Sequence, residues 1–94
     1  MFDAKISEGG EVILSGRFDA SQVDKARSVF DRITTTSEVD LKDLEYISSG
    51  GLSVLLLTQK RLGQTGHCLK LKNMNPHIRQ VFEYARFNMI FKIE

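Results

Sequence analysis

The periodicity of apolar residues changes several times along this chain, and these changes constrain the fold more than any other sequence feature. Near the amino terminus Phe2, Ala4 and Ile6 alternate with polar residues, which is the two-residue period of a half-buried strand. From residue 21 to residue 33 the apolar residues recur at steps of three and four, the period of an amphipathic helix. Such changes continue to the carboxyl terminus and predict a chain that passes repeatedly from strand to helix.

Turn and capping residues set the expected limits of these segments. Gly9-Gly10 predicts a tight turn between two antiparallel strands, and Gly16 is expected to end the second of them. Asp19 or Ser21 can cap the first helix, and Asn75 can cap the last. Strands are expected at residues 2–6, 11–15, 38–41, 68–72 and 90–93, with a further extended piece at residues 44–47. Helices are expected at residues 21–33, 52–62 and 76–88. The order β-β-α-β-α-β-α-β predicts an α/β fold, with a single mixed sheet of about five strands packed against three to four helices.

Composition and charge exclude several classes of protein. The 94 residues suit one domain, 1–94. Thirteen basic and twelve acidic residues leave a net charge of +1, whereas direct nucleic-acid binding requires a basic patch. The densest basic runs, Lys60-Arg61 and Lys70 with Lys72, are small and are interpreted as solvated faces. We therefore expect no direct binding of nucleic acid.

The single cysteine and the apolar runs indicate where the protein resides. Cys68 alone excludes an internal disulfide and a thiolate metal site. The longest apolar run, residues 54–57, is far shorter than the roughly 20 residues that span a bilayer. The amino terminus lacks a signal pattern. These features predict a cytoplasmic protein without membrane insertion.

Residues suited to catalysis are sparse. A nucleophilic site needs a base that an orienting partner holds in place, and the two histidines, His67 and His77, lie in positions that usually face solvent. No phosphate-binding loop, dinucleotide fingerprint or metal-ligand spacing is found. We therefore expect no enzyme activity, no catalytic residue, no metal and no cofactor.

The segment Ser48-Ser49-Gly50-Gly51-Leu52 lies where a predicted strand gives way to a predicted helix. One interpretation is structural: a serine caps the helix and the glycines shape the turn. The other is functional. A helix amino terminus offers free N–H groups and about half a positive charge, which suits an anion such as a phosphate on serine.

Residues 39–41 and 44–56, which include this segment, resemble the signature of the STAS-domain anti-sigma factor antagonists. In that family a strand with Asp-Leu leads through an aromatic and an apolar residue to Asp-Ser-Ser/Thr-Gly-Leu and a leucine-rich helix. Residues 13–20 are similar to the family's second strand and following loop, and residues 69–82 to its fourth strand and last helix. The resemblance thus covers nearly the whole chain.

This resemblance implies a switch in transcription regulation. The family's members are phosphorylated by an anti-sigma factor that is itself a serine kinase with a histidine-kinase-like ATPase fold. The unphosphorylated form binds that kinase and releases its sigma factor, and a PP2C-type phosphatase resets this partner switching. By position, the phosphoacceptor is Ser49, with Ser48 as second choice. The implied partner-binding residues are Asp19, Ala20, Ser21, Ser48, Ser49, Gly50, Gly51 and Leu52.

The chain departs from the family pattern at two positions. Ser48 stands where an aspartate is usual, which removes a negative charge next to the acceptor and offers a second hydroxyl. Gly50 replaces the usual second serine or threonine, which makes the start of the helix more flexible.

Two alternatives to the switch stay open. Some small STAS proteins resemble this chain and serve as constitutive accessory subunits of ATP-driven lipid transporters, where the same surface grips an ATPase without phosphorylation. A small enzyme or nucleotide-binding module is the third reading, and labelled nucleotide without any partner would test it.

Overall fold

One mixed sheet of five strands organises the chain. The computed structural model describes all 94 residues apart from the side chain of Asn88. The strands lie in the order β1-β2-β3-β4-β5, with bounds Asp3–Ile6, Val12–Phe18, Ser37–Ile47, Leu69–Lys72 and Lys92–Ile93. β1 is antiparallel to β2, and the remaining pairs are parallel. The predicted α/β fold with a single mixed sheet, and the predicted element order, are therefore confirmed.

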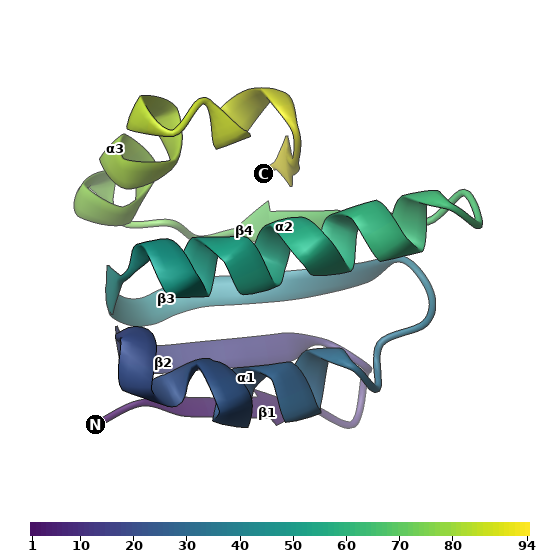
Figure 1. Cartoon of the computed structure of the whole chain (residues 1–94), viewed down its shortest axis with the longest axis horizontal. Coiled ribbons are helices and arrows are strands. Elements are labelled where there is room, and N and C mark those ends of the chain that lie inside the picture. The colour runs from purple at the N-terminus through teal and green to yellow at the C-terminus, as the bar shows by residue number, and fades with distance from the viewer.

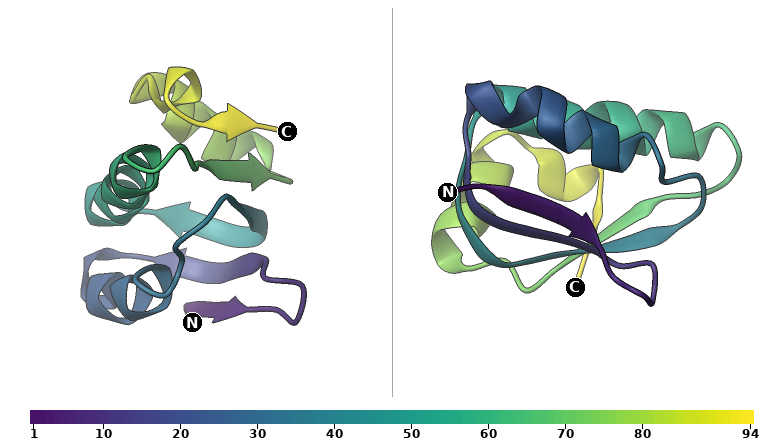
Figure 2. Two further views of the ribbon diagram at one scale, coloured as in Figure 1. Left: turned by 90° about the vertical axis from the view of Figure 1, so that its right-hand side faces the viewer. Right: turned by 90° about the horizontal axis from the view of Figure 1, so that it is seen from below.

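Two helices, α1 (Val23–Phe30) and α2 (Ser49–Gly63), lie side by side on the same face of the sheet (Figures 1 and 2). Both begin at the end of the sheet where β2 and β3 stop, as the connectivity of parallel strands requires. The third, α3 (Pro76–Tyr84), follows β4, and the amide of Asn75 at its start donates to the carbonyl oxygen of Leu44 over 2.9 Å. Two short 3-10 turns, η1 (Ala20–Gln22) and η2 (Phe87–Met89), complete the chain.

The core lies between the sheet and the helices. Alternate strand residues face the helices, since successive side chains of a strand point to opposite faces. The largest side chains that are fully buried include Phe18, Phe30 and Phe82. Buried strand residues on this face are Val12, Leu14, Val39, Leu41, Leu69 and Leu71.

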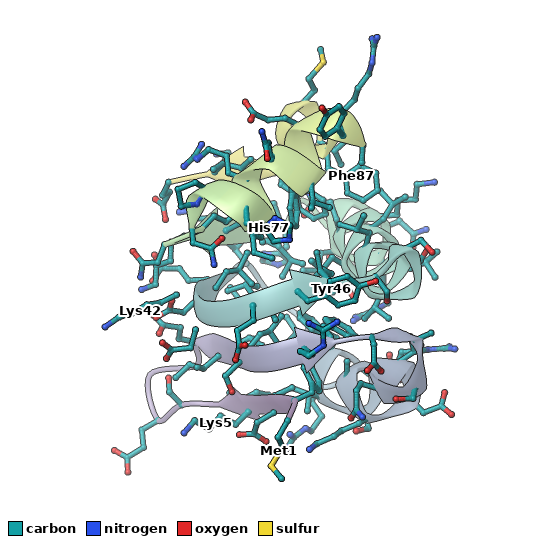
Figure 3. All side chains as sticks on the ribbon, turned by 90° about the vertical axis from the view of Figure 1, so that its left-hand side faces the viewer. Met1, Lys5, Lys42, Tyr46, His77 and Phe87 are labelled. Carbon is teal, nitrogen blue, oxygen red and sulfur yellow. The ribbon has the colours of Figure 1, made fainter. Side chains whose placement is uncertain are left out.

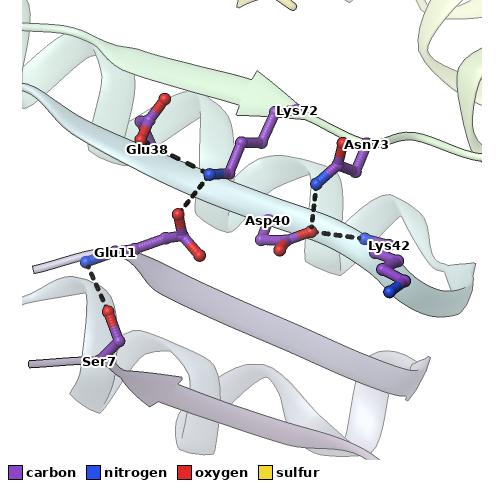
Figure 4. Close-up of polar contacts among 7 residues, drawn as sticks. All are labelled: Ser7, Glu11, Glu38, Asp40, Lys42, Lys72 and Asn73. Atoms are coloured by element: carbon purple, nitrogen blue, oxygen red, sulfur yellow. Dashed lines mark hydrogen bonds and ion pairs between the residues drawn. The ribbon is translucent and has the colours of Figure 1, made fainter. Parts of the chain in front are cut away.

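The opposite face of the sheet carries a polar network (Figure 4). The ammonium of Lys72 forms ion pairs with Glu11 and, over 3.6 Å, with Glu38. Asp40 accepts hydrogen bonds from the amide of Asn73 at 3.2 Å and from the backbone of Lys42 at 2.9 Å. Lys72, which was predicted to belong to a solvated face, is half-buried, and its ammonium pairs with carboxylates from β3 and from the residue before β2.

Two strands are longer than predicted. β2 does not end at Gly16 but passes through it to Phe18, because Gly16 adopts a φ of +80° within a register shift. A Cβ at this position would lie 1.6 Å from the carbonyl oxygen of Met1, so only glycine fits. β3 is one strand of eleven residues, not two pieces. Its register shifts between Asp40 and Asp43, which breaks the alternation that the sequence showed.

Three helix limits also differ from expectation. The first helix is split, with η1 followed by α1. α1 stops at Phe30, because the guanidinium of Arg61 donates to the carbonyl oxygens of Phe30 and Ile33 at 2.9 and 2.8 Å. Arg61 is exposed, as predicted, and its guanidinium also binds the end of α1. α2 starts three residues early, at Ser49. The prediction that Asn88 closes the last helix is wrong.

The last helix ends at Tyr84, because Arg86 turns into the left-handed region with a φ of 60°. The predicted last strand shortens to Lys92–Ile93. No helix in the part of the chain that the structure describes has the length and apolarity to cross a bilayer.

Candidate functional site

The carboxyl ends of β2 and β3 bring two loops together. Phe18 and Ile47 are partners in the parallel register, and the backbone N–H of Ser48 donates to the carbonyl oxygen of Phe18 over 2.9 Å. Residues 19–21 and residues 48–52 therefore start from one point of the sheet. The structure thus brings together both groups of residues that the resemblance assigned to a partner-binding surface.

Ser48 is the N-cap of α2. Its backbone is extended, with φ −85° and ψ 170°, and its hydroxyl oxygen accepts a hydrogen bond from the N–H of Gly51 at 3.1 Å. The side chain is half-buried. The structural interpretation of the serine–glycine segment is therefore correct for Ser48.

Ser49 is the first residue of α2 and is exposed. Its hydroxyl stands at the positive end of a fifteen-residue helix whose first turn contains no acidic residue. Lys60 and Arg61 occupy the last turn, at the negative end of the same helix. A negative group on Ser49 would complement the helix dipole, and nothing in the first turn already does so.

The neighbouring loop is held by Asp19. Its carboxylate accepts hydrogen bonds from the backbone N–H of Ser21 at 3.0 Å and from the Ser21 hydroxyl at 2.6 Å, and so caps η1. Ala20 and Ser21 are exposed beside the start of α2. Of the two predicted caps, Asp19 is the one used, and its carboxylate fixes the shape of the loop.

The two glycines of the segment are packing positions. A Cβ on Gly51 would lie 2.8 Å from Cγ1 of Ile47 and 3.1 Å from Cγ of Phe18, so the helix start packs directly on the ends of both strands. A Cβ on Gly50 would lie 3.0 Å from Cγ2 of Val23. Because Gly50 has no side chain, α2 packs close to the start of α1. Gly50 therefore has a packing role in addition to the flexibility expected from the sequence.

A stacked pair at the same end of the sheet was not predicted. The guanidinium carbon of Arg17 lies 4.5 Å from the centre of the Tyr46 ring, a cation–π arrangement. Figure 3 shows Tyr46, together with His77 from the first turn of α3, at this end of the molecule. In the sequence, Arg17 and Tyr46 each stand two residues before the loop that follows their strand. This equal spacing becomes informative only once β2 and β3 are known to pair.

The two histidines lie in different elements, since His67 follows α2 and His77 lies in the first turn of α3. His67 lies beyond the far end of α2, where its Nδ1 is 3.3 Å from the hydroxyl of Thr36. No group of three or more metal-ligating side chains is found among the described residues. The arrangement around Ser49 is suited to binding a protein or an anion.

Comparisons with known proteins agree with this architecture. A family model described as "Mlab, STAS domain" matches residues 3–92. BtrV of Bordetella bronchiseptica, named as a candidate anti-sigma factor antagonist, is 43% identical over 74 residues, which make up 79% of this chain and 58% of BtrV. The match thus spans less than two thirds of that relative. A STAS-domain-containing protein of Pseudomonas aeruginosa is 30% identical over 83 residues, or 85% of this chain and 82% of the relative.

Solved structures share the fold. The anti-sigma factor antagonist SpoIIAA in its unphosphorylated form superposes with a TM-score of 0.72 at 19% identity, covering 100% of this chain and 87% of SpoIIAA. A candidate anti-sigma factor antagonist from Thermotoga maritima superposes with a TM-score of 0.79 at 24% identity, covering 98% of this chain and 84% of that protein. The family match over residues 3–92 and the Pseudomonas aeruginosa relative lead to one conclusion: the chain belongs to the STAS-domain family.

Proposed function

We propose that this protein is an anti-sigma factor antagonist whose binding to its partner is controlled by phosphorylation of Ser49. The observation that carries the proposal is the exposed hydroxyl of Ser49 at the first position of α2, beside the loop that Asp19 holds. The unmodified protein binds an anti-sigma factor through this surface and so frees a sigma factor. In this role the chain acts by binding, without chemistry of its own.

Ser49 is a better phosphoacceptor than Ser48. The Ser48 oxygen already accepts the N–H of Gly51 and is half-buried, so a phosphate there would disturb the cap. Ser49 is exposed at the first position of α2. A kinase can therefore reach the Ser49 oxygen without unfolding the helix start.

The energetics favour an effect on the partner over an effect on the fold. A phosphate adds about −1.5 to −2 charges, and an exposed anion at a helix amino terminus gains about 0.3–1 kcal/mol. That gain is too small to refold a packed domain. An uncompensated dianion inside a protein interface costs several kcal/mol, and each 1.4 kcal/mol changes the Kd about tenfold. Phosphorylated Ser49 thus releases the partner and leaves the sheet intact.

The proposed partners follow from this mechanism. The anti-sigma factor is a serine kinase with a histidine-kinase-like ATPase fold that both binds this surface and transfers phosphate to Ser49. A PP2C-type phosphatase removes the phosphate and restores binding. The similarity to BtrV, which is named as a candidate anti-sigma factor antagonist, supports an anti-sigma factor as the partner, and the kinase and phosphatase activities follow from the proposed phosphorylation of Ser49.

Phosphate transfer tests the proposal. Serine-kinase anti-sigma factors from the same genome are incubated with the protein and labelled ATP, and the modified residue is mapped by mass spectrometry. We expect label on Ser49, normal labelling of Ser48→Ala, and none on Ser49→Ala. Labelling of Ser49→Ala at the wild-type rate would contradict the assignment.

The family model's description as Mlab supports a second candidate, a constitutive accessory subunit of an ATP-driven lipid transporter. The same surface would then hold an ATPase subunit permanently. In that case the protein purifies from its own cells with a transporter ATPase and carries no phosphate on Ser49. Substantial phosphorylation of Ser49 in those cells would exclude the constitutive role.

A further inference from the structure

The first three residues of α2 face three different sides of the helix. Successive residues of an α-helix are rotated by about 100°, so Ser49, Gly50 and Gly51 cannot share one side. Gly51 faces the sheet, where a Cβ would lie 2.8 Å from Cγ1 of Ile47. Gly50 faces α1, and Ser49 is left on the side that points away from the sheet, in agreement with its exposure. On the α1 side, Ser49 is therefore flanked by Gly50.

Val23 occupies the space in front of Gly50. It is the first residue of α1, and its Cγ2 would lie 3.0 Å from a Cβ on Gly50. Since adjacent Cα atoms are about 3.8 Å apart, this methyl group lies within about 8 Å of the Cα of Ser49. Val23 is half-buried, because it packs against the core and keeps part of its surface in solvent. Its side chain thus borders the proposed phosphoacceptor.

Val23 also lies between the two loops of the proposed partner-binding surface, residues 19–21 and 48–52. Its backbone N–H donates to the carbonyl oxygen of Ala20 and so ends η1, the turn that Asp19 caps. Its side chain contacts the start of α2 at Gly50. A protein that covers both loops must therefore cover Val23.

The presence of Val23 depends on the absence of a side chain at position 50. A separation of 3.0 Å is shorter than the ordinary contact distance between carbon atoms, about 3.5–4.0 Å. The serine or threonine that is usual in the family at position 50 would therefore collide with Val23. In this chain the surface beside Ser49 carries the methyl groups of Val23 in place of that hydroxyl.

We propose that Val23 is a specificity-determining contact of the partner-binding surface and that Gly50 is the residue that makes room for it. Val23 offers the anti-sigma factor a branched apolar surface beside Ser49. An anti-sigma factor shaped for a hydroxyl at position 50 would bury a polar group without a partner against these methyl groups, which lowers its affinity. The inference rests on the proposed function, because it names a further contact with the same partner. Ser49 controls whether the partner binds, and Val23 selects which partner binds.

Three variants separate a contact with the partner from packing within the chain. Val23→Thr replaces one methyl group by a hydroxyl and keeps the branched shape. Gly50→Ser places a Cβ against Val23, and the double variant Val23→Ala with Gly50→Ser removes that collision. Val81→Thr is the matched control, because Val81 is also half-buried and lies on α3, on the opposite side of α2 from α1 (Figure 1). Urea unfolding measures the stability of every variant.

The main readout is the Kd for the ADP-bound anti-sigma factor kinase that phosphorylates Ser49. Val23→Thr is expected to raise this Kd about fivefold or more, because a buried methyl contact is lost and a hydroxyl is desolvated. Val81→Thr stays within about twofold of wild type. The double variant regains the urea midpoint that Gly50→Ser loses, but its Kd stays about tenfold or more above wild type.

Selectivity is measured with a second anti-sigma factor kinase, one whose own antagonist has serine or threonine at the position equivalent to Gly50. The ratio of its Kd to that of the first kinase is expected to fall at least about tenfold in the double variant. An unchanged ratio overturns the role of Val23 in partner choice.

The remaining outcomes separate this inference from the proposed function. Wild-type affinity of Val23→Thr, or of the double variant once its stability has recovered, shows that Val23 only packs and overturns the inference. Equal weakening by Val81→Thr overturns it as well. In each case loss of binding in Ser49→Asp leaves the switch intact. Weakened binding of Val23→Thr with normal binding of Ser49→Asp supports the contact and overturns the switch. If no anti-sigma factor kinase binds the folded wild-type protein, both proposals are overturned.

Discussion

The backbone N–H of Ser48 donates a hydrogen bond to the carbonyl oxygen of Phe18 over 2.9 Å. This bond continues the pairing of β2 with β3 by one residue beyond Ile47 and fixes where α2 begins. The position of Ser49 is therefore set by the sheet itself. A rigid origin of this kind suits a switch in which modification changes the surface and leaves the fold unchanged.

The close packing at Gly51 predicts a large effect of a small substitution. A Cβ there would lie 2.8 Å from Cγ1 of Ile47, so Gly51→Ala forces the helix start away from the sheet. We expect the free energy of unfolding to fall by about 1–3 kcal/mol. Gly63→Ala is the matched control, because a Cβ at that end of α2 meets no atom within 4 Å. It is expected to be neutral or to gain up to about 1 kcal/mol. Urea unfolding measures both, and equal stabilities would contradict the packing.

The cap at Ser48 predicts how the family's usual aspartate behaves here. Ser48→Ala removes the acceptor of the Gly51 N–H and should lower the free energy of unfolding by about 1 kcal/mol. Ser48→Asp should retain wild-type stability, since aspartate caps as well as serine. Thermal unfolding of the two variants and of Ser53→Ala, an exposed position within the helix, checks the ranking. A fully stable Ser48→Ala would show that the cap contributes nothing.

Arg86 predicts a stabilising substitution. Its φ of 60° is costly for a residue with a Cβ, so Arg86→Gly should raise the free energy of unfolding by about 1 kcal/mol. Asn73 has a similar φ of 61°, but its amide donates to Asp40. Asn73→Gly loses that bond and should gain less than Arg86→Gly. Denaturant midpoints of both variants test the comparison, and a larger gain for Asn73→Gly would contradict it.

The polar network on the open face of the sheet predicts a dependence on alkaline pH (Figure 4). The hydrogen bond to Glu11 raises the pKa of the Lys72 ammonium above its ordinary value of 10.5. A group whose pKa is higher in the folded state than in the unfolded state stabilises the protein fully at pH values below its unfolded-state pKa. This stabilisation is lost as the pH rises through the folded-state pKa. The stability difference between wild type and Lys72→Met should therefore narrow as the pH rises above 10.5.

Unfolding measured over this pH range, with Lys92→Met as the control, checks that prediction. Lys92 is exposed, and no carboxylate among the described side chains lies within 4.0 Å of it. A difference for Lys72→Met that stays constant with pH would show that the ion pair does not contribute.

The periodic patterns were sufficient for the fold, because each element buries one face. The alternation of Phe2, Ala4 and Ile6 and the helical spacing after Ser21 each reflect contact with the same core. The predicted end of β2 at Gly16 and the predicted end of the last helix at Asn88 were wrong for a shared reason. Gly16 is a glycine because Met1 passes over it, and the last helix stops because Arg86 turns left-handed. Neither contact nor dihedral angle is visible in a local pattern.

The residues of the candidate site could be predicted from the sequence, but their arrangement in space could not. The serine–glycine segment and Asp19 stand out in the sequence, but their proximity depends on β2 pairing directly with β3. Arg61 shows the same limit, since its role at the end of α1 joins residues about thirty positions apart.

The affinity of the phosphorylated protein tests the central claim most directly. Protein carrying phosphate on Ser49, unmodified protein and the exposed-loop control Thr34→Asp are each titrated into the ADP-bound anti-sigma factor kinase by calorimetry. A desolvation cost of several kcal/mol predicts that phosphate on Ser49 weakens binding at least about a hundredfold, while Thr34→Asp binds like wild type. Equal dissociation constants for the phosphorylated and unmodified proteins would contradict the account.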